Sequence, residues 1–464
     1  MSTFHDQRGV AYSAASQEAV DRFDATMNEY VHFGTETGAR LKETLTADPE
    51  FPMALCLRGY FFQLFSIPAL TEKAKQSLSK AREAGANHGV SDREEQHIEA
   101  LTAWTAGDMQ SALAHWESIL LDHPLDMLAV KLSQFTHFYL GDSRCLRDSI
   151  ARILYAWHPE VPGHANILGM YAFGLEESGD YASAERTGRL AVEEDPADAW
   201  SVHAVAHVME MQDRRRDGIA WIGELKSHWS TANNFRFHLW WHLALCHLEL
   251  AQHDEVLRLY DTEFRAEHSE EYLDICNATS MLWRLEERGV DVGDRWDELA
   301  SISATRIDGH GLIFPHMHFM LALAAGGDAR GGDAMLRSLE AASGEAGVTQ
   351  AGVIDSVGLE LARAIAAWYR GDYDGVVERL LPIRYSLPDI GGSHAQRDLF
   401  HQILIAAALR APRPVLARAL LSERARLKPN NAWTWQRYAQ ALNALGDDTA
   451  AREATQQARL LMPA

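Results

Sequence analysis

Four copies of one spacing constrain the fold of this chain more than any other feature. A Gly-Asp pair is followed, seventeen residues after the glycine, by a proline: Gly107-Asp108 to Pro124, Gly179-Asp180 to Pro196, Gly371-Asp372 to Pro388 and Gly446-Asp447 to Pro463. Glycine accepts the left-handed backbone angles of a tight turn between helices, and proline ends the second helix because it cannot continue one. The spacing therefore predicts stacked helical hairpins.

Two of these units also carry small residues at regular offsets. The final unit has Trp435, Ala439, Leu442, Gly446, Ala451, Ala458 and Pro463 at tetratricopeptide offsets, with Pro429 one 34-residue period before Pro463. A second good copy contains Ala172, Gly179, Tyr181, Ala184, Ala191 and Pro196. Such small residues let the two helices of a hairpin approach closely. Between 210 and 360 the repeat is poor, which indicates hairpins of irregular length or insertions.

Helical periodicity dominates the whole chain and strand alternation is hard to find. We therefore expect an all-α, tetratricopeptide-like superhelix (an α-solenoid), tightly curled around a concave pocket. The expected organisation is one domain over residues 1–464, with atypical N-terminal helices in 1–90 and tetratricopeptide-like hairpins in 91–464.

Composition excludes several classes of protein. With 464 residues, 47% of them apolar, the chain can bury a large core. Its 43 basic and 65 acidic residues give a net charge of −22, which repels phosphate backbones, so nucleic acid is not expected as a partner. The sequence contains no C-x-x-C pair, so we expect reduced thiols at all four cysteines, Cys56, Cys145, Cys246 and Cys276. The start of the chain does not resemble a signal peptide and no apolar stretch is long enough to cross a membrane, so we expect a cytoplasmic protein.

A first polar stripe lies in the segment 198–210. The helical step of about 100° per residue places Trp200, His203, His207 and Glu210 on one narrow face. Two imidazoles at i and i+4 can present nitrogens to one cation, and a carboxylate one turn later supplies a third ligand or a base. The alternative is that these histidines only form hydrogen bonds between helices. The H-E-x-x-H signature, which would favour a metal, is absent.

Two further segments repeat this theme. In 237–249, His238, His242, Leu245 and Glu249 share a face flanked by Trp241. The alternative interpretation is a packed aromatic seam with neutral histidines. In 280–286, Trp283 and Glu286 lie one turn apart beside Arg284, and an Arg-Glu pair there could equally be a plain ion pair between helices.

The fourth segment, 391–401, starts with two glycines. Ser393 is expected to cap the helix that follows, whose first free amides can receive an anion. His394, Arg397, Asp398 and His401 then share one face by their spacing. Arg397 could bind a carboxylate while a His-Asp pair moves protons. A capping motif with a satisfied polar network is the equally weighted alternative.

Four sequence strings carry a resemblance to a known family. They are the segments 163–200, HAVAHVMEM (203–211), SMLWRLE (280–286) and GGSHAQRDLF (391–400). Together they resemble the tetratricopeptide repeat protein 38 family, and the likeness extends over nearly the whole chain. The resemblance implies an α-superhelix whose characteristic strings include the His203/His207 and His394/Arg397/Asp398 segments. It implies no particular reaction.

These observations lead to one principal hypothesis: the concave side forms a polar-aromatic pocket for a small organic molecule, with acid-base or metal-assisted chemistry of a hydrolase or lyase kind. The predicted catalytic groups are His203, His207, Glu210, His242, His394 and Asp398, and the first three are also candidate ligands of a divalent metal. The predicted substrate-binding residues are Trp200, Trp241, Arg284, Arg397, His164 and His316. The competing hypothesis is a non-catalytic scaffold that binds a peptide of a protein partner in its groove. The sequence leaves the oligomeric state open.

Overall fold

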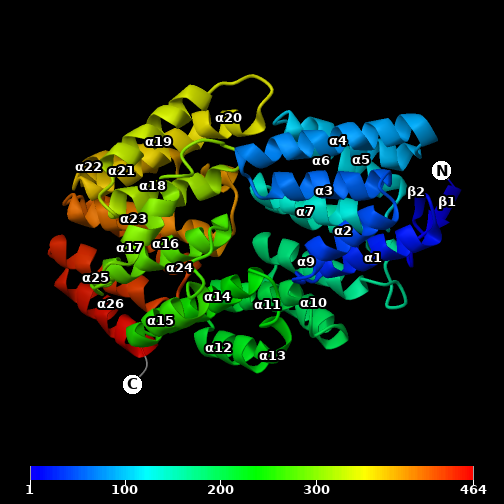
Figure 1. Cartoon of the computed structure of the whole chain (residues 1–464). Helices are drawn as coiled ribbons and strands as arrows, with labels where there is room; N and C mark the ends of the chain where they lie inside the picture. The colour runs from blue at the N-terminus through cyan, green and yellow to red at the C-terminus, as the bar shows by residue number, and fades with distance from the viewer. Residues whose placement is uncertain (1, 463–464) are drawn as a thin grey trace.

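The computed structural model describes residues 2–462 as a long series of helices (Figure 1). The first half contains β1 (Ser2–His5), β2 (Ala11–Ala14), α1 (Gln17–Val31), α2 (Thr37–Ala47), α3 (Pro52–Leu64), α4 (Pro68–His88), α5 (Asp92–Thr105), α6 (Met109–Asp122), α7 (Met127–Tyr139), α8 (Ser143–Ile153), η1 (Leu154–Ala156), α9 (His164–Glu177), α10 (Tyr181–Glu194), α11 (Ala199–Met211), α12 (Arg215–Glu224) and α13 (Lys226–Trp229). The second half contains α14 (Phe235–Glu249), α15 (His253–Leu259), η2 (Tyr260–Phe264), α16 (Tyr272–Glu287), α17 (Arg295–Ser303), α18 (Ile313–Ala325), α19 (Ala329–Ala342), α20 (Thr349–Val353), η3 (Ile354–Gly358), α21 (Leu359–Tyr369), α22 (Tyr373–Ile383), η4 (Leu387–Ile390), α23 (His394–Arg410), α24 (Pro414–Leu427), α25 (Ala432–Ala444) and α26 (Asp448–Leu461). The all-α, tetratricopeptide-like superhelix predicted from the repeat is confirmed.

The Gly-Asp pairs form the turns inside the hairpins. Gly107, Gly179, Gly371 and Gly446 all have positive φ angles, between 74° and 90°. The aspartate that follows each glycine is the N-cap of the next helix and accepts a backbone N–H three residues on, as Asp108 does from Ser111. Gly141-Asp142 and Gly327-Asp328 do the same without a proline at the expected distance, so the repeat continues where the spacing missed it.

The prolines behave less uniformly than the glycines. Pro124 and Pro196 follow directly on the ends of α6 and α10, as expected. Pro388 instead lies in η4, beyond α22, and Pro382 is tolerated inside the last turn of that helix. Pro463 lies outside the described residues. The glycine and its capping aspartate therefore mark the hairpins better than the proline does.

The superhelix curls so far that distant segments touch across its interior (Figure 1). The backbone N–H of Asn233 donates to the carbonyl of Phe33 at 2.7 Å, and that of Thr349 donates to Gly107 at 3.1 Å. Gly141 and Gly391 provide a second seam: a Cβ on Gly141 would lie 1.8 Å from the Pro388 carbonyl oxygen. Segments from opposite ends of the sequence thus enclose one interior.

Two local features differ from the sequence-based expectation. Residues 2–14 form a short antiparallel hairpin, in which Ser2 pairs with Ala14 and His5 with Ala11. Two strands of four residues are too short for alternation to show in the sequence. The stretch from 210 to 360, where the repeat is poor, contains the very short α13 and the wide-turned segments η2 and η3, so its hairpins are irregular in length. The division at residue 90 stays a prediction.

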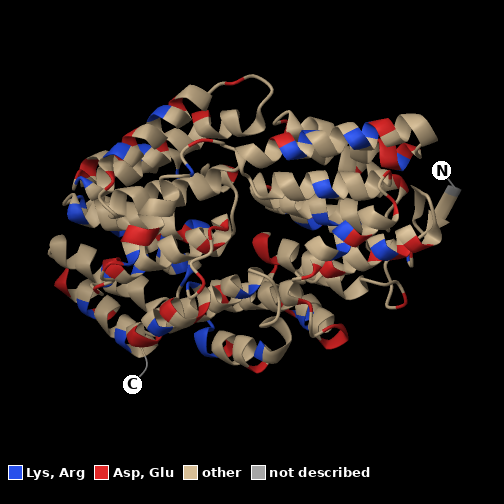
Figure 2. Cartoon of the chain, viewed as in Figure 1, with Lys and Arg blue, Asp and Glu red and all other residues tan. Residues whose placement is uncertain are grey.

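The surface is rich in charge of both signs. Figure 2 shows acidic and basic residues interspersed along the outer helices. Within residues 2–462, none of the helices combines the length and the apolar character that crossing a bilayer requires.

Gly141→Ala tests whether the seam depends on close backbone approach. Alanine there suffers left-handed strain and overlaps Pro388, so we expect a loss of roughly 3 kcal/mol or more in unfolding free energy. Gly179→Ala is the matched control, because its φ is also positive but its Cβ meets no described atom within 4 Å; strain alone should cost about 1 kcal/mol. Chemical denaturation measures both, and equal losses would contradict the seam.

Candidate functional site

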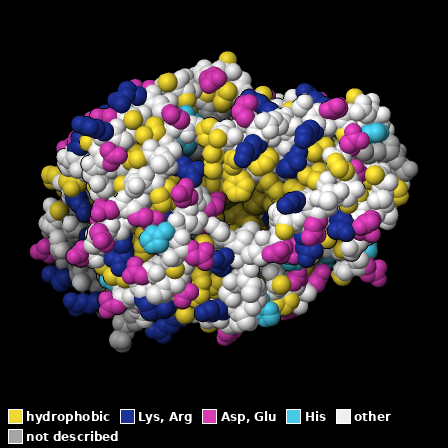
Figure 3. Space-filling model, in the orientation of Figure 1, with side chains coloured by type: hydrophobic (Ala, Val, Ile, Leu, Met, Phe, Trp, Pro, Cys, Tyr) yellow, Lys and Arg dark blue, Asp and Glu magenta, His cyan; other side chains and the backbone are white. Residues whose placement is uncertain are grey.

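A partly open cavity of about 440 Å³ lies where the curled segments meet. Its lining comes from α1, α3, α7, α9, α11, α14, α16, α18 and the start of α23, segments far apart in the sequence. Its aromatic lining residues are Tyr30, Phe33, Phe65, Phe135, Phe138, Tyr139, Phe173, Trp200, Phe235, Tyr272 and Phe314. On the face shown in Figure 3, hydrophobic side chains surround a central hollow. The volume falls in the range of small-molecule sites.

The aromatic wall is an ordered stack of rings. Phe33, in the turn after α1, stacks on Phe235 with ring centroids 4.3 Å apart and faces Trp200 at 5.9 Å. Trp200 is therefore a wall residue, as predicted. Trp241 lies one layer behind, where it stacks on His238 at 5.2 Å and donates its indole N–H to Ser280. It supports the site from behind and is not among the cavity residues.

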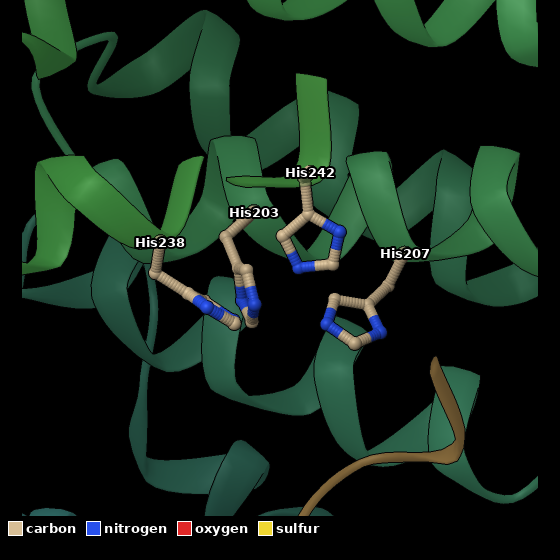
Figure 4. Close-up of side chains that lie close together, drawn as sticks. All are labelled: His203, His207, His238 and His242. Carbon is tan, nitrogen blue, oxygen red and sulfur yellow. The ribbon is translucent and has the colours of Figure 1, made fainter. Parts of the chain in front are cut away.

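Four histidines from two neighbouring helices converge beside this wall (Figure 4). His203 and His207 are one turn apart on α11, and His238 and His242 are one turn apart on α14. When one nitrogen is taken from each of the four rings, all four nitrogens lie within 4.8 Å of one another. His203, His207 and His238 line the cavity, with His242 behind them. The two i, i+4 pairs therefore form one cluster.

The nitrogens of this cluster are almost entirely unpaired. In the described part of the chain, both ring nitrogens of His203, His207 and His242 are buried without a hydrogen-bond partner. His238 differs, because its Nδ1 lies 3.1 Å from Oδ1 of Asn277, which leaves Nε2 for the centre. Burial, helped by the neighbouring imidazoles, holds the pKa of His203 well below its usual value. Neutral imidazoles whose ring nitrogens have no hydrogen-bond partner are the form that binds transition metals.

A buried pair of carboxylates joins this cluster to the start of α23. Oε2 of Glu176 lies 3.6 Å from Nδ1 of His207. Glu177 accepts the backbone N–H of His394 at 2.9 Å and a guanidinium N–H of Arg397 at 3.3 Å. Burial, reinforced by the adjacent Glu177, raises the pKa of Glu176 well above its usual value. The groups predicted on α11 and on α23 are thus connected through one polar network.

The start of α23 has the predicted capping geometry but an internal anion. Ser393 caps the helix and forms a reciprocal capping box with Gln396. The anion at the first free amide is the chain's own Glu177, and Arg397 also donates to the carbonyls of Gly391 and Gly392. The carboxylate that Arg397 holds in this structure is therefore that of Glu177.

His394 and Asp398 are not paired with each other. Asp398 accepts two hydrogen bonds from the guanidinium of Arg424, and a third from Gln402 at 2.7 Å. Against the effect of burial, the charge and hydrogen bonds of Arg424, together with the charge of Lys428, hold the pKa of Asp398 well below its usual range. The ring of His394 points instead to Glu177, 3.6 Å from Nδ1 to Oε2. The spacing predicted that Asp398 orients His394 as a base. The two are not paired, because Arg424 on α24 binds the aspartate.

The other predicted residues are dispersed. Glu210, one turn beyond His207, is not part of the four-histidine cluster. The further nitrogens come instead from the histidines of α14. Arg284 is buried and donates to the carbonyls of Ser280 and Ala395. His164 is hydrogen-bonded to Glu194 and is not a cavity residue. His316 lines an adjoining hollow of about 940 Å³, with its Nδ1 2.9 Å from the Leu312 carbonyl.

Three side chains close to the cavity were not predicted from the sequence to have a role. His238 was recognised on its helix face but was not assigned a role, although its i, i+4 relation to His242 was a usable signal. Glu176 lies three residues before a Gly-Asp pair, where acidic residues are ordinary. Glu271 lines both hollows, and nothing in its local sequence distinguishes it from its neighbour Glu270.

No family model matches the chain. Solved structures with a similar helical arrangement include a human IFIT1 dimer with m7Gppp-AAAA, 13% identical over 97% of this chain and 96% of that one, with a TM-score of 0.41. Naa15/Naa10 bound to HypK-THB is 13% identical over 96% of this chain and 63% of that one, with a TM-score of 0.26. The TPR domain of P58(IPK) is 12% identical over 80% and 98%, with a TM-score of 0.22. Likeness at this level concerns helical-repeat architecture alone.

Glu271→Gln tests the electrostatics of the cavity mouth. Burial and the nearby Asp274 raise the pKa of Glu271 to about 8, with Arg306 opposing them. The folded state therefore binds a proton that the unfolded state releases near pH 4, so stability falls as pH rises from about 4 through 8. Glutamine still accepts the Leu273 N–H without ionising, so the variant should lose less stability than the parent over this window, by roughly 1.4 kcal/mol for each unit by which the pKa is raised.

Glu270→Gln is the matched control for this pH dependence. Its side chain is 69% exposed, so its substitution should leave the slope of stability against pH unchanged. Denaturant unfolding at several pH values supplies the slopes. A parental slope in the Glu271 variant would show that this carboxyl is ionised in the folded protein at neutral pH.

Proposed function

We propose that the chain binds a small, largely apolar organic molecule in the aromatic cavity and acts on it at the four-histidine cluster. The observation that carries this proposal is the group of buried, unpaired nitrogens of His203, His207 and His242 beside a hollow of small-molecule size. Buried polar groups in folded proteins nearly always have partners. Unpaired nitrogens gathered from two helices are therefore expected to meet a ligand.

The ligand of the nitrogens themselves would be a divalent transition metal. Imidazole suits zinc, copper, iron and nickel, and a tetrahedral set at zinc–nitrogen distances places its nitrogens about 3.3 Å apart. The four histidines come within 4.8 Å, so small ring movements would close the set. Asn277 would orient His238 as outer-sphere acceptors commonly do for metal-bound histidines.

The predicted reaction class is hydrolysis or elimination at the metal. A metal ion that keeps a coordination position open beyond the histidine nitrogens would polarise a carbonyl or activate water there, and Glu176 would hold or pass the proton because its carboxyl lies next to His207. Trp200 and Phe235 would form flat walls against the substrate. His394 and Arg397 would act through Glu177, which they contact, and Asp398 through Arg424.

The remaining inferences from the sequence belong to the same proposal. The resemblance to the tetratricopeptide repeat protein 38 family and the cytoplasmic location rest on the sequence strings and on the cysteines, all four of which are free thiols. The net charge of −22 argues against nucleic acid as a partner. The peptide-scaffold alternative has less support, because the cavity between the curled hairpins is of small-molecule size and is walled by aromatic rings.

Metal analysis tests the centre directly. Protein purified without a metal-affinity tag should contain about one transition-metal ion per chain, and His207→Ala or His242→Ala should abolish this content. Asn277→Ala should weaken binding about 10- to 100-fold, because it removes the acceptor that orients His238. Elemental analysis after dialysis against graded chelator measures these effects.

His164→Ala is the matched control for metal content. Like His207, this histidine lies on a helix and contacts a carboxylate, but it is outside the cluster, so its loss should leave the metal unchanged. A parent protein without metal after growth in medium supplemented with zinc, iron and manganese would rule out the centre.

Thermal-shift screening of small organic molecules tests the cavity. A ligand at a hundred times its dissociation constant should stabilise the folded chain by about 2.7 kcal/mol. Trp200→Ala and Phe235→Ala should lose this shift because they remove the stacked wall, whereas Trp435→Ala, a tryptophan in the last hairpin, should retain it. A shift that survives the loss of both wall residues would place the ligand elsewhere.

A further inference from the structure

Lys131 on α7 is a buried lysine without a carboxylate partner. Only 2% of the residue is exposed, and among residues 2–462 no acidic oxygen lies within ion-pair distance of its ammonium nitrogen. Four rings surround that nitrogen instead: Phe33 at 4.2 Å, Phe135 at 4.9 Å, Trp200 at 5.3 Å and Tyr30 at 5.9 Å from the ring centroids. A charged ammonium is rarely buried in this way unless it is paired.

The cage around Lys131 is part of the ligand cavity. All four of its rings are cavity-lining residues, supplied by α1, the turn after it, α7 and α11. The amine lies directly behind this wall and is not itself a lining residue, so capture of a ligand requires one of the four rings to turn aside. The histidine cluster is reached from the same wall, since Trp200 and His203 are packed with ring centroids 5.0 Å apart.

Desolvation prepares this amine for chemistry. Burial lowers the pKa of Lys131 to about 8, opposed by the carboxylate of Asp198, the buried N-cap of α11. A larger share of the amine is then unprotonated near neutral pH than in an ordinary lysine. Lysines desolvated among apolar groups are the ones that serve as nucleophiles toward carbonyl compounds.

We infer that Lys131 captures a carbonyl group of the cavity ligand as an imine, which makes a planar aldehyde or ketone the class of molecule bound. The inference rests on the proposed function, because the cavity must first admit the ligand. The neutral amine attacks the carbonyl carbon, a carbon–nitrogen bond forms, and the carbonyl oxygen leaves as water after proton transfer. The step needs no oxidant or reductant, and hydrolysis reverses it.

The cage favours this role over that of an anchor for a ligand carboxylate. The faces of aromatic rings carry partial negative charge, so four of them around one nitrogen stabilise a cation and disfavour an anion brought into the same space. A neutral, flat carbonyl compound meets no such repulsion and can stack on Phe33 or Trp200. A protonated imine formed in the cage would also benefit from the ring faces.

Reductive trapping with benzaldehyde tests the inference on the full chain. Cyanoborohydride adds a hydride to the protonated imine and converts it to a stable benzylamine, which peptide mass spectrometry assigns to one of the seven lysines. The matched control is Lys226, an exposed lysine over the ring of Trp240 at 4.6 Å. We expect Lys131 to be labelled at least about tenfold faster than Lys226, because Lys131 combines a lowered pKa with a neighbouring binding cavity.

Variants and a non-reacting analogue separate this inference from the cavity proposal. Lys131→Arg and Lys131→Met should lose the fast label while Lys226 reacts as before, with folding checked by thermal melting. Excess benzyl alcohol, which has the same ring but no carbonyl, should slow labelling of Lys131 alone. Equal labelling of the two lysines would overturn the inference, and a stabilising shift with benzyl alcohol in that case would leave the cavity proposal standing. Equal labelling without any shift would count against both.

Discussion

Close backbone contact across the interior is the constraint on which the rest of this structure depends. Gly141 packs against the carbonyl of Pro388 and Gly391 against that of Tyr139, at distances that leave no room for a Cβ. Repeat hairpins contact mainly their neighbours, so a solenoid by itself sets only a local rise and rotation. Here the additional seam joins α7 to the segment before α23 and draws the superhelix around a partly open cavity.

Polar groups beside this cavity differ from those elsewhere in the core. At the start of α7, Asp126 is fully buried, but its Oδ2 lies 2.5 Å from a guanidinium nitrogen of Arg93 and 3.1 Å from Nε2 of His97. Buried charge is normally accommodated by such pairing. Beside the cavity, His203, His207 and Glu176 are buried without such hydrogen bonds among the described residues. The first arrangement holds helices together, and the second leaves binding capacity unused, which is a property of sites.

Predictions from the sequence were correct where the residues concerned lie on a single helix. The 3.6-residue period placed Trp200, His203 and His207 on one face, and it placed His238 and His242 together on another. It failed where a partner comes from another helix: Asp398 was assigned to His394 one turn away, whereas Arg424 from α24 holds it. The sequence around Lys131 and Glu271 does not predict a site. The residues that surround these two side chains include ones more than sixty positions away in the chain.

The amino-acid sequence alone determined the helices, their glycine turns with aspartate caps and the polar stripe on each helix, because these depend on backbone angles and on contacts within a few residues. Tertiary structure alone decided which stripes face each other, which carboxylates meet which arginines and how much space remains between them. Those outcomes depend on how small rotations accumulate along the superhelix until its segments meet. The four-histidine cluster is the clearest case: each half is visible in the sequence, and only the packing of α11 against α14 makes it one centre.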